Sequence, residues 1–186
     1  MSSTPLSKAV PARKFFADGG QFHLMSLFVQ WEKEKQGTCL SDHVPVGSRT
    51  VCGYTLPSFQ RHYVWTDEQC EKFLESAYMG LHLGTYVYND LQQFKNPELS
   101  YLLIDGQQRL TAISRYWNDE IAIAGEDGVR RKWSELKETE QAHFMRIGIG
   151  WSCTNTHDEN VLRDLYNRMA FGGTSHPPEQ RASPKI

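Results

Sequence analysis

A short apolar run that gives way to a polar turn and then to a new periodic segment constrains the fold of this chain most strongly. The run Tyr101–Ile104 is too short for a helix and ends at Asp105-Gly106, so it predicts a buried strand that stops at a turn. From Leu110 to Trp117, apolar residues recur at helical spacing, which predicts a helix with one apolar face. We therefore expect a strand that leads directly into a helix.

This turn gathers polar groups of the kind that bind anions, namely Asp105, the Gly106 backbone, Gln107, Gln108 and Arg109. Free N–H groups and the helix dipole favour an anion at a helix N-terminus, and the forked guanidinium of Arg109 suits phosphate oxygens. Asp105 would then hold a metal ion or orient a water molecule. A plain turn explains the same residues, because Asp-Gly often only joins two elements. The glycine-rich Walker pattern for phosphates is absent from the sequence.

The composition excludes several classes of protein. The 186 residues suit one domain, and a hydrophobic fraction of 39% excludes wholesale disorder. A net charge of −2 lacks the basic excess of a dedicated nucleic-acid coat. The four cysteines are widely spaced, which indicates reduced packing residues rather than a zinc site. Without a signal peptide or an apolar run long enough to span a membrane, we expect a cytoplasmic protein with no membrane partner.

The remaining segments are predicted from their periodicity and their turn residues. We expect three parts: an irregular N-terminal arm over residues 1–20, one domain over residues 21–181, and a C-terminal tail over residues 182–186. Within the domain the predicted elements are a helix over 21–36, an edge strand within 38–54, a capped helix from Thr66 to Gly80, a strand over 85–88, a hairpin over 121–131, a helix ending at 144, a strand over 146–153, and a helix from Asp158 to Gly172.

The stretch from Leu56 to Trp65 is rich in aromatic residues, yet it carries Gln60 and Arg61 at its centre. Because Pro57 forces an extended backbone and no regular period follows, we predict a packed loop. Polar side chains within such a loop need buried partners or a ligand, so Gln60 and Arg61 are expected to approach the turn at 105–109. A purely structural role, in which both residues tie the loop to backbone carbonyls, explains them equally well.

The apolar faces of the predicted segments define a core. We expect one core between the helices and a small mixed sheet, with its centre formed by Trp31, Phe73, Leu103, Ile104, Ile113 and Leu165.

Three separated blocks resemble the N-terminal domain family of GmrSD-type restriction endonucleases. They are the aromatic loop with its following helix and Gly80–Gly84, the DGQQR box at 105–109, and the segment from Leu162 to Thr174. Together they span about residues 21–181. Their combination is specific, whereas a lone DGQQR would not be.

The resemblance implies an α+β fold of the ParB/sulfiredoxin type and a nucleotide-handling role in a restriction or phage-defence system. It implies that Asp105, Gln108 and Arg109 are catalytic and that nucleotide is bound by Gln60, Arg61, Gly106, Gln107, Gln108 and Arg109. A Mg²⁺ ion held by Asp105 would offset the phosphate charge. One departure is Ala170, which stands where the family usually has Asn. A second is that no His-Asn-His nuclease pattern occurs before Ile186, so we expect an incomplete restriction enzyme.

Two functions from different classes follow. The first is a Mg²⁺-dependent NTPase domain that works with a nuclease subunit or on DNA. The second is a non-enzymatic, phage-encoded interaction protein that inhibits or competes with a host protein. Ala170 favours the second, and the intact box from Asp105 to Arg109 favours the first. A third idea, direct DNA nicking, is disfavoured by the near-neutral charge.

Overall fold

The computed structural model describes residues 15, 18–41, 44–91 and 98–171. Its centre is one six-stranded mixed sheet in the order β1-β8-β4-β5-β3-β2, and the fold is α+β. The strands are β1 (Asp18–His23), β2 (Arg49–Val51), β3 (Tyr54–Leu56), β4 (Thr85–Asn89), β5 (Leu102–Asp105) and β8 (Gly148–Thr154). A separate hairpin is formed by β6 (Ile123–Ala124) and β7 (Arg130–Arg131).

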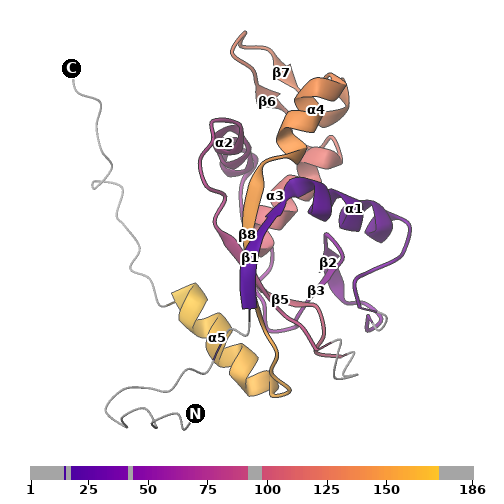
Figure 1. Ribbon diagram of the computed structural model, residues 1–186, viewed down its shortest axis with the longest axis vertical. Helices are drawn as coiled ribbons and strands as arrows, with labels where there is room; N and C mark the ends of the chain where they lie inside the picture. The colour runs from indigo at the N-terminus through magenta and orange to yellow at the C-terminus, as the bar shows by residue number, and fades with distance from the viewer. Residues whose placement is uncertain (1–14, 16–17, 42–43, 92–97, 172–186) are drawn as a thin grey trace, which may run out of the picture.

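Within the described residues, five α-helices pack around this sheet (Figure 1). They are α1 (Leu24–Lys35), α2 (Asp67–Tyr78), α3 (Gln107–Trp117), α4 (Glu138–Met145) and α5 (Glu159–Phe171), and a short 3-10 helix, Trp133–Glu135, precedes α4. Helix α2 starts at the predicted capping box, in which Thr66 and Gln69 bond to each other's backbone N–H groups. Helix α5 starts at Asp158, whose carboxylate accepts a hydrogen bond from the N–H of Asn160.

Strand β5 lies inside the sheet, parallel to β3 and antiparallel to β4. Because successive side chains of a strand point to opposite faces, Leu103 joins the large core under α1 to α4, whereas Leu102 and Ile104 face α5. Figure 1 shows α5 apart from the other helices. Strand β5 is thus covered on both faces, which explains its continuous apolar sequence.

The prediction of a single core is therefore wrong. Trp31, Leu103 and Ile113 belong to the larger cluster, and Ile104 and Leu165 form a second cluster with Val87, Leu102 and Leu162. Phe73 is only partly buried against the larger cluster. Periodicity identifies the apolar face of each segment but not the face of the sheet that the segment covers. The predicted single core therefore combines residues that lie on opposite faces of the sheet.

Two boundaries also differ from the prediction. Residues 18–20, assigned to the irregular arm, form the first half of β1, and the first helix begins at Leu24 rather than at Gln21. Residues Tyr54–Leu56 form a strand of their own, although the prediction divides them between the edge-strand region that ends at residue 54 and the aromatic loop that begins at Leu56. The rest of the arm apart from Phe15, the end of the closing block beyond Phe171, and the tail over 182–186 lie outside the described residues.

Candidate functional site

The turn between β5 and α3 has a backbone that only glycine accommodates easily. Gly106 caps α3 with a φ of 101°, in the left-handed region. A Cβ added there would lie 2.6 Å from the Cβ of Tyr86, so the turn also lacks space for a side chain. Burial raises the pKa of the Tyr86 hydroxyl to about 12, and that hydroxyl lies 3.2 Å from the hydroxyl of Tyr54. The turn thus rests on a neutral, closely packed tyrosine.

A pocket of about 280 Å³ lies beside this turn. It unites the turn, the aromatic loop and the last turns of α5. Its lining residues are Gln60, Arg61, Trp65, Asp105, Gly106, Gln107, Gln108, Arg109, Tyr166, Met169 and Ala170. The structure therefore brings together every residue that the sequence nominated for the site, although about 45 positions separate the loop from the turn. The expectation that Gln60 and Arg61 approach the turn is confirmed.

The guanidinium of Arg109 is held from two sides. Its Nη2 donates to the carboxylate of Asp105 at 2.7 Å and to the backbone carbonyl of Thr85 at 2.8 Å. Gly84, which has a φ of 77°, makes room for this group, because a Cβ at that position would collide with Nη1 of Arg109. Strand β4 and the residue before it thus set the position of the arginine, and one Asp105 oxygen is engaged in the ligand-free protein.

Gln108 is directed at the aromatic loop. Its side-chain oxygen accepts hydrogen bonds from the backbone N–H groups of Val64 at 2.9 Å and Trp65 at 3.2 Å. Its Nε2 donates to the carbonyl of His62 at a longer 3.4 Å. With only 8% of its surface exposed, Gln108 fastens the loop to α3.

Two other glutamines in the pocket carry buried side-chain oxygens. Gln60 and Gln107 are each 5% exposed, and among the described residues the Oε1 atom of each has no hydrogen-bond partner. Leaving such an acceptor unpaired costs roughly 1–3 kcal/mol. A ligand that donates hydrogen bonds would satisfy both groups.

Arg61 stands at the exposed rim of the same pocket. Its backbone N–H donates to the hydroxyl of Tyr166 at 3.2 Å, which ties the loop to α5. No hydrogen bond or ion pair engages its guanidinium within the described parts of the chain. The loop itself is braced by Arg49, which donates to the carbonyls of Gln60 and Arg61 at 2.7 and 3.2 Å.

The first turn of α3 supplies further donors. In an α-helix the first N–H groups have no partner within the helix, and here the residues that carry them, Gln107, Gln108 and Arg109, line the pocket. The dipole of α3 adds a partial positive charge at the same place. The pocket therefore combines donors suited to an anion with two unsatisfied acceptors.

Among the described residues that line the pocket, Asp105 alone carries a carboxylate. Among the residues that the structure describes, no group of three or more His, Cys, Asp or Glu residues is arranged to hold a metal ion. Mg²⁺ commonly uses one or two carboxylates together with substrate phosphates and water. The donor set thus fits a Mg²⁺ ion that arrives with phosphates, and it does not form a cage by itself.

Sequence reasoning missed three residues that shape this site. Arg49 lies in an edge strand with no local signal of its contacts with the loop. Gly84 was recognised only as part of a block, although its space is what admits Arg109. Tyr166 lies within the predicted helix from Asp158 to Gly172, and nothing local indicates that its hydroxyl accepts a hydrogen bond from the loop. Only contacts between distant segments reveal these roles.

Comparison with known protein families shows the family to which the chain belongs. The family model described as "GmrSD restriction endonuclease, N-terminal domain" matches residues 45–174, which include every residue that lines the pocket. The chain belongs to this GmrSD N-terminal domain family. The match connects it with restriction systems, and it leaves β1 and α1 outside the matched region.

One curated protein is also similar. The chain is 29% identical over 77 residues to uncharacterized protein MJ0686 of Methanocaldococcus jannaschii. The matched region covers 31% of this chain. The chain spans only 13% of the length of that protein. No solved structure matches the chain. Within the described ranges, no helix has both the length and the apolar character needed to cross a membrane.

Proposed function

We propose that the pocket beside the β5–α3 turn binds a nucleoside triphosphate and that the domain acts in a restriction or phage-defence system. The observation that carries this proposal is the coexistence of two kinds of group in one pocket. The first turn of α3 and Arg61 offer donors for phosphate oxygens. Gln60 and Gln107 offer buried acceptors, which a bare phosphate leaves unsatisfied and which the hydroxyl or amino groups of a nucleoside satisfy.

The size of the pocket limits how the nucleotide sits. Sites for small molecules usually measure about 300–1,000 Å³, and this one measures about 280 Å³. We infer that the triphosphate and part of the nucleoside enter the pocket while the rest lies against its rim, where Arg61 and Met169 are exposed. We therefore expect the pocket to discriminate only weakly between different nucleotide bases.

Hydrolysis is the second part of the proposal. Asp105 would hold a Mg²⁺ ion through its carboxylate, and the ion would offset the phosphate charge while a water molecule displaces the nucleoside diphosphate from the terminal phosphate. Arg109 and the amides of α3 stabilise charge on the phosphate oxygens. Gln108 acts through the loop rather than on the phosphates, because its amide is already bonded to that loop.

The experiment is thermal unfolding with each nucleoside triphosphate, with inorganic triphosphate, and with or without Mg²⁺. A ligand at about 100 times its dissociation constant stabilises the folded protein by roughly 2.7 kcal/mol. We expect nucleotides to stabilise more than inorganic triphosphate does, and we expect released phosphate in a parallel assay. A flat response to all of them would reject nucleotide binding, and binding without phosphate release would reject the enzymatic part.

The alternative is a non-enzymatic interaction protein that keeps the fold. A specific observation favours it: in the ligand-free protein, Asp105 and the Thr85 carbonyl already satisfy Nη2 of Arg109. Ala170 lies in the pocket lining, so the departure from the family falls at the site itself. Replacing Ala170 by Asn separates the two functions, because a gain in nucleotide affinity is expected only if the pocket binds nucleotide.

A further inference from the structure

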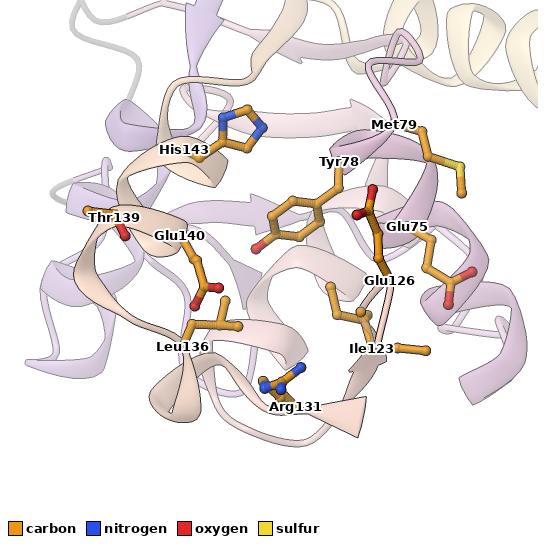
Figure 2. Close-up of a pocket in the computed structure, with 12 residues that line it drawn as sticks. Glu75, Tyr78, Met79, Ile123, Glu126, Arg131, Leu136, Thr139, Glu140 and His143 are labelled. Carbon is orange, nitrogen blue, oxygen red and sulfur yellow. The ribbon is translucent and has the colours of Figure 1, made fainter. Parts of the chain in front are cut away.

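A second and larger pocket lies between α2, the β6–β7 hairpin and α4. It measures about 690 Å³ and shares no lining residue with the pocket beside the DGQQR box. Figure 2 shows the ring of Tyr78 at its centre, with Glu140 on one side and with Glu75 and Glu126 on the other. Helix α2 thus forms a cavity together with two elements that follow much later in the sequence, and the proposed nucleotide binding does not involve this cavity.

The floor of this pocket is apolar and well supported. The Tyr78 ring packs against Phe144 at a centroid distance of 5.0 Å and stacks on His143 at 6.1 Å. Its hydroxyl lies 3.3 Å from that of Tyr116, and burial raises the pKa of Tyr78, so the ring stays neutral. Ile123, Ala124 and Leu136 complete the apolar lining. The cavity is therefore formed in advance and does not need a ligand to open it.

The charges around this floor are unbalanced. Glu75, Glu126 and Glu140 all line the pocket, and the single lining arginine, Arg131, is bonded to Asp127 at 3.0 and 2.5 Å. Glu140 accepts a hydrogen bond from the N–H of Lys137. For Glu75 and Glu126, no hydrogen bond or ion pair occurs within the portion of the chain that the structure describes. Arg130 interacts electrostatically with Glu75, but its guanidinium is paired with Glu71, so Glu75 and Glu126 can still attract an incoming cation.

The apolar surface continues beyond the rim. Met79 lines the pocket with 78% of its surface exposed, and nearby Leu81 is 60% exposed. Exposed apolar residues that extend a pocket in this way are typical of protein-binding surfaces. A nucleic acid is disfavoured, because its phosphates would meet three carboxylates.

We propose that this pocket docks a segment of a partner protein that combines a lysine or arginine with an adjacent apolar side chain. The cation meets Glu75 and Glu126, while the apolar side chain packs on Tyr78 and Met79. Carboxylates set against an apolar floor complement that chemistry in both charge and shape. This surface does not overlap the proposed nucleotide pocket, so a result that rejects one proposal leaves the other unaffected.

The test is selection of random peptides displayed on phage against the immobilised full chain, followed by affinity measurement of the enriched peptides. We expect sequences in which Lys or Arg lies beside Leu, Met or an aromatic residue. The double variant Glu75→Gln, Glu126→Gln keeps the side-chain shapes and is expected to weaken binding by about tenfold or more. The matched control is Glu32→Gln, Glu98→Gln, which removes two exposed carboxylates outside the pocket and leaves the affinity unchanged.

The salt dependence of peptide binding tests the role of charge, and the melting temperatures of the variants test whether the fold is retained. Binding of the basic peptides is expected to weaken at about 0.5 M salt, because exposed charges are screened. Equal melting temperatures of the two double variants verify that the fold is retained. Enrichment of peptides without basic residues, no enrichment at all, or equal binding by the two double variants would overturn the proposal. Self-association that the pocket variant abolishes would also overturn it, because a second copy of the chain would then be the occupant.

Discussion

The guanidinium of Arg109 donates to the carboxylate of Asp105 at 2.7 Å, although both residues belong to the box expected to contact phosphates. The side chain that we propose as a phosphate ligand is therefore engaged in an ion pair within the domain. Both side chains are partly exposed, at 23% and 38%, so solvent screens the pair and limits its contribution to stability. A triphosphate that competes for Arg109 would release Asp105 for Mg²⁺.

The first prediction concerns Arg109→Lys. Lysine keeps the charge but lacks the fork, so we expect the free energy of unfolding to fall by about 1 kcal/mol and nucleotide affinity to fall as well. Denaturant melts without ligand and calorimetric titration with nucleotide measure the two effects. The control is Arg168→Lys, which alters an i,i+4 pair on the exposed side of α5. Unchanged nucleotide affinity in the Arg109 variant would restrict Arg109 to a structural role.

The second prediction concerns the glycines before β4. Gly80 and Gly84 both have positive φ, at 82° and 77°, but only Gly84 has Arg109 where a Cβ would lie. We expect each Gly→Ala change to cost about 1 kcal/mol of stability through the backbone, with a larger loss at Gly84 because Arg109 is displaced. Only Gly84→Ala is expected to weaken nucleotide binding. Equal binding by the two variants would mean that the position of Arg109 is unimportant.

The third prediction concerns Gln108. Replacing it by Ala leaves the N–H groups of Val64 and Trp65 without their acceptor, so we expect a loss of roughly 1–3 kcal/mol. Gln108→Glu keeps an acceptor oxygen and is expected to cost less. Hydrogen exchange of the Val64 and Trp65 amides reports on the loop directly and is expected to accelerate most in the alanine variant. Slow exchange in that variant would show that packing alone fixes the loop.

The fourth prediction concerns the two cores. Ile104 is fully buried, and its replacement by Ala is expected to cost about 2–5 kcal/mol. Ile104 and Leu165 share one cluster, whereas Ile113 lies in the other. In denaturant melts we expect the effects of Ile104→Ala and Leu165→Ala to be non-additive, and those of Ile104→Ala and Ile113→Ala to be additive. Strong coupling between Ile104→Ala and Ile113→Ala would contradict the conclusion that the sheet separates two cores.

Much of the local structure follows from neighbouring residues. The capping box at Thr66 and the turn at Gly106 depend on interactions over a few positions, so pattern and propensity predict them correctly. The family could also be recognised, because its blocks are short stretches of contiguous residues. The roles of the site residues in nucleotide chemistry stay predictions.

By itself, the sequence determined which segments have apolar faces, where most of the helices and strands lie, and that polar residues gather at the β5–α3 turn. The tertiary structure decided the rest. It assigned Leu103 and Ile104 to opposite cores, bonded Gln108 to a loop about 45 positions earlier, and placed Arg109 in the space left by Gly84. The physical reason is that such contacts depend on the order of strands in the sheet and on the face that each helix covers. These are choices between distant segments, and no local period encodes them.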